Sequence, residues 1–350
     1  MGNEDYRVFM MHRYSQFSTS ESAHKVRCTL CPAQCVLAPG KRGICGTRAN
    51  LDGRLEILTW GRFAAVAVDP IEKKPLSHFL PGTQTFSLGT EGCNLVCPFC
   101  QNASLSQCTR MPGYAPEPIR QWTPEEVVRE AMDSHCASIA FTYSEPVLAT
   151  EFAMEVATLA RKHSLKLVFV TNGQINQNPL LELCEHLDAA NIDLKSFSQD
   201  VYRTQLKGSL SATLDAIVLM HDRGVWVEIT TLVVPGMNDS ESELAEIAGF
   251  IAGVSPDIPW HVSRFHPAFK ERTRPPTDGK MILGALEIGA AAGLRYVYAG
   301  NMPTGQGEKT CCPNCRNVVV ERTGYRVNRI NTEQSRCPRC GWNIAGVGFP

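Results

Sequence analysis

Residues 85–102 read TFSLGTEGCNLVCPFCQN, and this stretch decides the fold. Residues 85–88 predict a short apolar strand, which Gly89 and Gly92 interrupt. Three cysteines follow with C-x3-C-x2-C spacing: Cys93, Cys97 and Cys100. A [4Fe–4S] cluster is usually held by four thiolates, so three thiolates on one loop leave one iron open to a cofactor or substrate. The spacing therefore favours a catalytic cluster over a simple electron carrier.

Three buried cysteines, or three of four zinc ligands, are the plain alternatives for this triplet. The glycines beside it, the strand before it and the repeated units after it favour a cluster loop at the start of an α/β domain.

Apolar runs alternate with amphipathic segments after the triplet, which predicts β–α units. The expected strands are 138–143, 166–170, 189–194, 225–234 and 260–265, with a last short one at 295–298. Between them, helices are expected at about 123–135, 146–163, from 178, 209–221, 240–251 and 281–291. Thr123, Pro124 and Glu126 have the pattern of a capping box with proline at the first helical position. Periodicity leaves a barrel and a doubly wound sheet open, and both bind ligands beyond the carboxyl ends of the strands.

The composition is that of an ordinary globular protein. The chain has 350 residues, 43% of them hydrophobic and 20% charged, with a formal net charge of −1. Such a balance offers no overall field for nucleic acid or membranes. Without a run of 18 apolar residues or the apolar core of a signal peptide, we expect a cytoplasmic protein with no membrane partner.

Fifteen cysteines are present, and eleven fall into three spaced groups, which indicates metal binding in a reducing compartment. The groups divide the chain into a Cys-rich region at 1–80, a core at 81–300 and a ribbon-like segment at 301–350. The other four, Cys108, Cys136, Cys184 and Cys311, have no such spacing.

Two C-x2-C knuckles lie in the last segment, at Cys312, Cys315, Cys337 and Cys340. Four thiolates in this arrangement predict a structural zinc ribbon, with rubredoxin-like iron as the alternative. Residues 301–350 contain seven Lys and Arg against three Asp and Glu, a weak indication of an RNA or acidic partner. A balanced, solvated metal domain is the plainer interpretation.

The first segment holds Cys28, Cys31, Cys35 and Cys45 among prolines and glycines. No β–α units follow them directly, so we do not assign the catalytic cluster here. Zinc and an auxiliary [4Fe–4S] cluster are both open for this loop-rich group.

The triplet resembles the hallmark of the radical S-adenosylmethionine (SAM) superfamily. Further motifs extend the resemblance over residues 25–342: residues 69–76 (DPIEKKPL), 89–94 (GTEGCN), 191–195 (NIDLK), 264–267 (RFHP) and the late knuckles. Together they are similar to the radical SAM member of the AmmeMemoRadiSam system, whose barrel is related to that of pyruvate formate-lyase-activating enzymes. The resemblance implies a partial (β/α)6 TIM-like barrel with small Cys-rich metal-binding extensions at both ends.

The same resemblance implies a chemistry. SAM binds the open iron, and the reduced cluster cleaves it to methionine and a 5′-deoxyadenosyl radical that abstracts hydrogen from a substrate. The cofactor carries this chemistry, and the protein supplies orientation and shelter. A reductant such as flavodoxin or ferredoxin is implied, and Memo-like and AMMECR-type proteins are the suggested partners.

Polar residues at the expected strand ends are the candidates for SAM contacts. Glu145 could accept a hydrogen bond from the SAM ammonium in place of the superfamily's Gly-Gly-Glu motif, although a helix-terminal Glu is the alternative. Period 2 puts Asp193 and Lys195 on one side of a strand, where a structural ion pair is the alternative. The further candidates that the resemblance covers are Thr171, Asn172, Thr230 and His266.

Several functions compete at this point. The chain could install a glycyl radical on a partner protein, or it could modify a small molecule or RNA. It could also be a non-enzymatic iron–sulfur or zinc scaffold that moves electrons, or a zinc-ribbon binding module with an inert barrel. An intact three-cysteine loop favours the enzyme.

Overall fold

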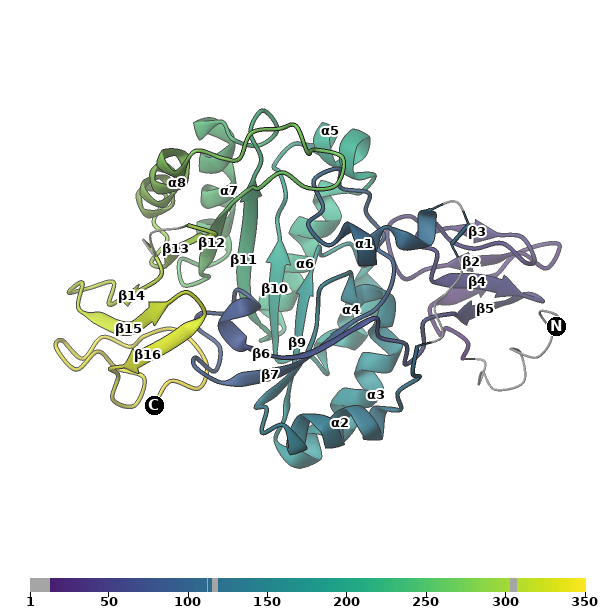
Figure 1. Ribbon diagram of the computed structural model, residues 1–350, viewed down its shortest axis with the longest axis horizontal. Helices are drawn as coiled ribbons and strands as arrows, with labels where there is room; N and C mark the ends of the chain where they lie inside the picture. The colour runs from purple at the N-terminus through teal and green to yellow at the C-terminus, as the bar shows by residue number, and fades with distance from the viewer. Residues whose placement is uncertain (1–12, 112, 115–118, 303–306) are drawn as a thin grey trace.

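The computed structural model describes residues 13–111, 113–114, 119–302 and 307–350 (Figure 1). Its strands are β1 (Ser18–Ser20), β2 (Val26–Cys28), β3 (Val36–Leu37), β4 (Arg48–Leu51), β5 (Arg54–Ile57), β6 (Ala65–Pro70), β7 (Gln84–Gly89), β8 (Ser138–Phe141), β9 (Lys166–Thr171), β10 (Ala189–Asp193), β11 (Trp226–Val233), β12 (Trp260–Arg264), β13 (Val297–Gly300), β14 (Thr310–Cys311), β15 (Val318–Thr323) and β16 (Arg326–Ile330). Its α-helices are α1 (Ala103–Ser106), α2 (Pro124–Asp133), α3 (Thr150–Ala160), α4 (Gln177–Cys184), α5 (Gln199–Val201), α6 (Leu210–Asp222), α7 (Glu241–Val254) and α8 (Gly279–Ala291).

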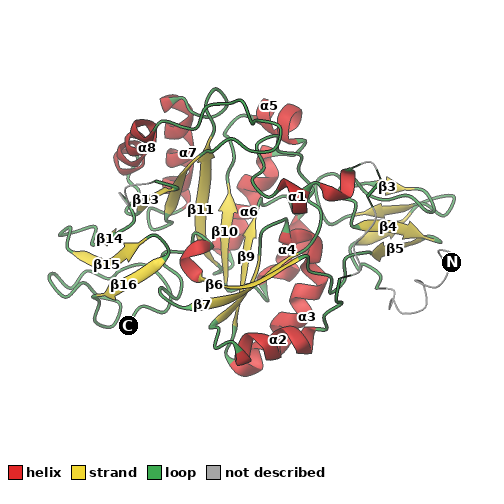
Figure 2. Ribbon diagram, in the orientation of Figure 1, coloured by secondary structure: helices red, strands yellow, loops and turns green. Residues whose placement is uncertain are grey.

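The core is an eight-stranded sheet with the strand order β13-β12-β11-β10-β9-β8-β7-β6. Every pair from β7 to β13 is parallel, and β6 joins the edge antiparallel to β7. Because the order follows the chain, each crossover moves one strand in the same direction. Crossovers of one hand therefore bring their helices to one face, as in an open part of a (β/α) barrel (Figure 2).

The expected partial barrel is confirmed, with a mixed α/β core and small cysteine-rich extensions. The capping box is also confirmed: the Thr123 hydroxyl accepts from the Glu126 N–H, and the Glu126 carboxylate accepts from the Thr123 N–H. The strand expected at 138–143 ends earlier, at Phe141, because Tyr143 has a φ of 68°. Strand β6 and its antiparallel pairing are additions to the predicted sheet. The domain boundaries proposed from the cysteine groups stay a prediction.

An N-terminal module, residues 13–64, holds the first four cysteines. It consists of an antiparallel sheet β1-β2-β3 and the hairpin β4-β5. Arg48 on β4 is 1% exposed and binds Glu151 on α3, with Nη2 2.6 Å from Oε2 and Nη1 2.8 Å from Oε1. The Ser15 hydroxyl donates to the same carboxylate at 2.6 Å. A two-bond guanidinium–carboxylate pair is directional, so it orients the module on the core.

The module also touches the cysteine loop. Gly92 precedes Cys93 and has a φ of +91°. A Cβ there would lie 2.7 Å from the Cys45 carbonyl oxygen and 2.6 Å from Thr47 Cγ2. Only glycine permits both this backbone conformation and this close approach.

The C-terminal ribbon, residues 307–350, is the antiparallel sheet β14-β15-β16 with the loops that carry its cysteines. It packs on the opposite end of the core from the N-terminal module (Figure 1). Arg322 on β15 is buried and donates to the Ser77 carbonyl oxygen at 2.7 Å. His78 contacts the Ala345 carbonyl oxygen and the Tyr298 hydroxyl, each at 2.6 Å. Among the residues with described placement, no helix is long and apolar enough to cross a bilayer.

We expect Gly92→Ala to destabilise the protein more than Gly224→Ala. Gly224 has a φ of +80° and no atom within 4 Å of an added Cβ, so that change costs only about 1–2 kcal/mol of backbone strain. Gly92→Ala adds the overlap with Cys45 and Thr47, worth about 1–3 kcal/mol more. Anaerobic urea denaturation of both variants measures the difference, and equal midpoints would contradict the close contact.

Candidate functional site

A cavity of about 520 Å³ lies at the carboxyl edge of the sheet. Cys93, Cys97 and Cys100 line one part of it, in the loop that follows β7. The Cys100 N–H donates to the Cys97 carbonyl oxygen at 3.3 Å, so a tight turn joins the last two cysteines. Among the residues that the structure describes, no fourth cysteine lines the cavity.

The surroundings of the three sulfurs suit thiolate ligands. Cys93 Sγ accepts from the Leu95 N–H at 3.3 Å and from Asn172 Nδ2 at 3.6 Å. Cys100 Sγ lies 3.1 Å from the Ser106 hydroxyl. Burial raises the pKa of Cys97 to about 11, while the Lys195 charge lowers it. Buried thiols of this kind become thiolates when a cation supplies the missing charge, so the donor set fits an iron–sulfur cluster with one open iron.

Glu145, at the end of the loop after β8, is 2% exposed and lines the same cavity. Its Oε1 accepts from the Thr171 hydroxyl at 2.5 Å and from the Val147 N–H at 3.1 Å, and its Oε2 accepts from the Asn172 N–H at 2.9 Å. A carboxylate offers about four acceptor positions, so these bonds leave one on Oε2. Burial raises the pKa of Glu145 to about 7 against the effect of the three hydrogen bonds.

The other predicted strand-end residues converge on this cavity as well. The parallel register pairs Ile192 with Thr171 and Asp193 with Thr230, which aligns the ends of β9, β10 and β11. Lys195 Nζ donates to Asp193 Oδ2 at 2.8 Å. The structure therefore brings together six of the seven candidates, namely Glu145, Thr171, Asn172, Asp193, Lys195 and Thr230.

His266 is different. It follows β12, but its side chain is exposed and does not line the cavity. Ser263, three residues earlier, provides the lining from β12. A contact between His266 and SAM stays a prediction.

Sequence reasoning missed a cluster of charges beside the cavity. Asp69 at the end of β6 accepts from Lys73 Nζ and Lys74 Nζ, each at 2.7 Å, and from the Tyr143 hydroxyl. Lys73, Lys74 and Tyr143 line the cavity. The motif DPIEKKPL is visible in the sequence, but the positive φ that aims Tyr143 at Asp69 is not.

The ribbon also reaches the cavity. Tyr325, in the turn between β15 and β16, lines it and is 52% exposed, and Asn301 lines it from the end of β13. Nothing in the local sequence around Tyr325 places it there, because the contact depends on how the ribbon packs against the core.

The two outer cysteine groups differ in geometry. Ligand atoms of Cys312, Cys315, Cys337 and Cys340 all lie within 4.8 Å of one another, as a single tetrahedral ion requires. Within the described ranges, no other group of His, Cys, Asp or Glu is gathered in this way. The N-terminal four are more widely spaced, although Cys35 Sγ and Cys45 Sγ lie 3.7 and 3.8 Å from a Cβ position on Gly43.

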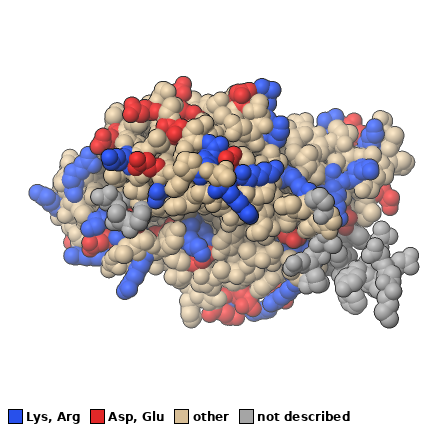
Figure 3. All heavy atoms as spheres, turned by 45° about the horizontal axis from the view of Figure 1, so that its top comes forward, with Lys and Arg blue, Asp and Glu red and all other residues tan. Residues whose placement is uncertain are grey.

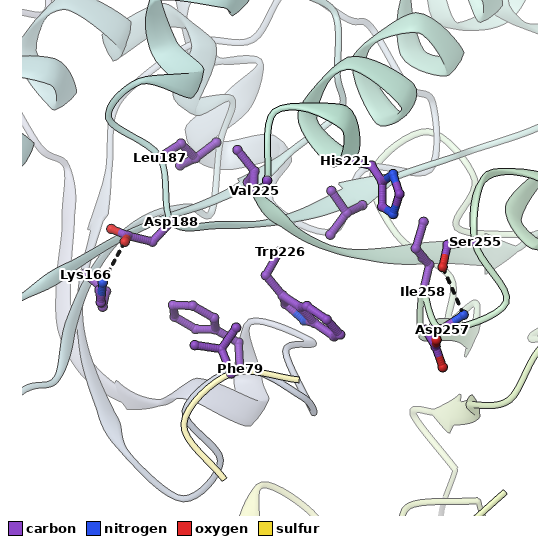
Figure 4. Close-up of a pocket in the computed structure, with 13 residues that line it drawn as sticks. Phe79, Lys166, Leu187, Asp188, His221, Val225, Trp226, Ser255, Asp257 and Ile258 are labelled. Atoms are coloured by element: carbon purple, nitrogen blue, oxygen red, sulfur yellow. Dashed lines mark hydrogen bonds and ion pairs between the residues drawn. The ribbon is translucent and has the colours of Figure 1, made fainter. Parts of the chain in front are cut away.

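A second cavity, of about 410 Å³, lies at the amino ends of the strands (Figure 4). Phe79 and Trp226 face one another in it, and Lys166 pairs with Asp188 at its rim. It contains none of the predicted site residues and no cysteine. In α/β proteins of this kind ligands bind at the carboxyl edge, so the cavity with the three cysteines is the candidate site.

Comparison with known proteins identifies the family of the chain. A family model described as the Radical SAM superfamily matches residues 87–248, from β7 into α7. The uncharacterized protein MJ0808 of Methanocaldococcus jannaschii is 39% identical over 337 residues, which cover 95% of this chain and 98% of that protein. The pyruvate formate-lyase-activating enzyme of Clostridium pasteurianum is 23% identical over 180 residues, 50% of this chain and 71% of that enzyme. The isethionate sulfite-lyase activating enzyme of Desulfovibrio desulfuricans is 26% identical over 124 residues, 35% of this chain and 39% of that enzyme.

The fold and the three-cysteine loop define an α/β iron–sulfur protein, and its candidate site is the cavity at the carboxyl edge of the sheet. The chain belongs to the radical SAM superfamily. It is therefore an enzyme, not a passive scaffold, and its family uses a [4Fe–4S] cluster, SAM and a reductant.

We expect Lys74→Met to lower the free energy of unfolding by about 1.5–3 kcal/mol, because it deletes a charged hydrogen bond inside the protein. Lys74 is 1% exposed, whereas the Lys73 side chain is 43% exposed. Lys73→Met is the matched control and should cost less than about 1 kcal/mol, although both lysines bind the same carboxylate. Anaerobic chemical denaturation compares the two, and equal losses would contradict the difference in burial.

Proposed function

We propose that Cys93, Cys97 and Cys100 bind the catalytic [4Fe–4S] cluster and that the chain abstracts hydrogen from a substrate. The proposal rests on one observation. Three thiols on one loop and polar residues at the ends of four strands all line the same cavity. When bound, the cluster supplies the electron that splits SAM into methionine and a 5′-deoxyadenosyl radical. The protein's own contribution is to bind and orient SAM and to keep water away.

Each residue has a role in this proposal. The remaining acceptor position on Glu145 Oε2 takes a hydrogen bond from the SAM ammonium. Lys195 uses one donor on Asp193 and keeps others for the SAM carboxylate. Asp193 Oδ1 accepts from a ribose hydroxyl. Thr171 and Asn172 hold Glu145 in place, and Thr230, whose hydroxyl donates to Asn191 Oδ1 at 2.9 Å, closes the wall beside them.

The substrate would then contact lining residues that have no assigned role toward SAM, among them Lys73, Lys74, Tyr143, Asn301 and Tyr325. Activation of a partner protein by a glycyl radical is the second candidate, which the named activating enzymes support. Membership of the AmmeMemoRadiSam system, the Memo-like and AMMECR-type partners, an RNA partner and a cytoplasmic location stay predictions.

We further propose that the C-terminal four cysteines bind zinc. Thiolates within 4.8 Å of one another match the spacing around one tetrahedral ion. Rubredoxin-like iron needs the same spacing, so metal analysis distinguishes the two.

The direct test is 5′-deoxyadenosine formation by anaerobic protein supplied with SAM and dithionite. We expect Cys97→Ala to abolish it and to lower the iron content, because one ligand of the cluster is lost. Cys184→Ala removes a cysteine outside the three groups and should leave both values unchanged. Normal product formation by Cys97→Ala would overturn the assignment of the cluster.

We expect SAM affinity to rise with pH through about 7. Above its pKa of about 7, Glu145 is a carboxylate and can accept from the SAM ammonium, whereas below it the group is protonated. Affinity should be about tenfold weaker at pH 6 than at pH 8. Isothermal titration calorimetry of the reconstituted protein measures the affinity at each pH. Glu145→Gln is the reference, because in this variant only the protonation of the SAM amino group can change the affinity. The variant should bind weakly with a flatter profile, and identical profiles would exclude Glu145 as the acceptor.

A further inference from the structure

The N-terminal cysteines form a site of a different kind from the ribbon. Cys28, Cys31, Cys35 and Cys45 lie in one compact module, where the Cys28 N–H donates to the Cys35 carbonyl oxygen at 2.9 Å. They are not gathered to the spacing of one ion, whereas the ribbon cysteines are. Zinc holds its four sulfurs at about 2.3 Å from one point. In a four-iron cluster each thiolate binds a different iron, so the sulfurs stand farther apart.

The inner side of this module lies against the catalytic loop. The Cys45 carbonyl oxygen faces Gly92, which directly precedes Cys93. Thr109, nine residues after Cys100, donates to the same carbonyl oxygen at 2.9 Å. On the other flank, Cys31 and Asn94 line one small cavity of about 150 Å³. The two cysteine groups are thus joined by direct contacts between residues next to their ligands.

The outer side is apolar and basic. Val36 and Ile44, which adjoin Cys35 and Cys45 in the chain, are 45% and 47% exposed. Lys41 and Arg42 are exposed beside them. Residues 13–64 contain eight Lys and Arg against three Asp and Glu. Figure 3 shows mostly blue charged side chains over this end of the molecule.

We propose that the N-terminal cysteines bind a second [4Fe–4S] cluster, which receives electrons from an acidic one-electron carrier protein and passes them to the catalytic loop. The assignment of the acceptor rests on the proposed function; the second cluster itself does not. One electron leaves the reduced carrier, reduces one ferric iron of the N-terminal cluster and moves on to the cluster at Cys93, Cys97 and Cys100. No bond is made or broken in this transfer. The exposed side chains of Val36 and Ile44 form the apolar surface that the carrier contacts. The positive charges of Lys41 and Arg42 attract the acidic carrier to it.

Metal content tests the cluster independently of SAM chemistry. In the variant Cys93→Ala/Cys97→Ala/Cys100→Ala, we expect about four iron atoms and one zinc per chain, with the electron paramagnetic resonance (EPR) signal of a reduced [4Fe–4S] cluster. Cys28→Ala/Cys31→Ala should lose that share of iron and keep 5′-deoxyadenosine formation with dithionite. Two zinc atoms per chain and no cluster signal in the triple variant would overturn the proposal. If the double variant does not fold, the metal content of the wild-type protein still distinguishes the two alternatives. A second cluster predicts about eight iron atoms and one zinc per chain, whereas a second zinc site predicts about four iron atoms and two zinc.

Charge reversal tests the route. Stopped-flow reduction by reduced flavodoxin should slow at least about tenfold at low salt in Lys41→Glu/Arg42→Glu, and the difference should shrink at high salt. Arg129→Glu/Lys162→Glu makes the same charge change at exposed positions on the core and should react as wild type does. Both variants should be reduced normally by dithionite. Equal rates of both variants with flavodoxin would show that electrons enter elsewhere.

Discussion

A fully buried carboxylate, Glu228 on β11, ties the segment after β6 to the central sheet. It accepts from the backbone N–H groups of Ser77 and His78 at 2.9 and 2.7 Å, and it pairs with His261 Nε2 at 2.7 Å. Burial would raise the pKa of Glu228, but the His261 contact outweighs it and keeps the group charged. A buried charge is tolerated only when it is fully paired, so the segment after β6 has little freedom to move off the sheet. His78 then holds the ribbon through Ala345, and it also contacts the Tyr298 hydroxyl on β13, which in turn contacts Thr310 on β14.

This arrangement explains why residues far apart in the chain meet at one cavity. Once Ser77 and His78 are attached to the sheet, the preceding turn presents Lys73 and Lys74 to Asp69 and Tyr143. The two ammonium groups share one carboxylate, so this cluster keeps a net positive charge, and burial lowers the pKa of Lys74 to about 8. Glu145 and Asp193, the acidic acceptors of the proposed SAM site, line the same cavity. A polarised cavity of this kind would orient a substrate with respect to SAM before any reaction occurs.

The sequence was informative wherever a signal was local. Spacing alone located the triplet, the position of Glu145 after a predicted strand made it a candidate, and the two-residue period of a strand put Asp193 and Lys195 on one side. Capping chemistry located the start of α2 to the residue. What could not be read depended on long-range packing: the antiparallel β6, the φ of Tyr143 and the approach of Tyr325 from the ribbon. His266 also follows a strand, but it is exposed and does not line the cavity, so its contact with SAM stays a prediction.

The cysteine groups show why ligand type by itself does not identify a metal site. All three use thiols, and two have four of them, yet among the described residues only the ribbon's four lie within 4.8 Å of one another. The N-terminal four lie on a module that docks on the core through Arg48 and that contacts Gly92 next to the catalytic loop. Selection for closeness to the catalytic loop would produce such an interface, whereas a purely structural ion needs no contact with that loop.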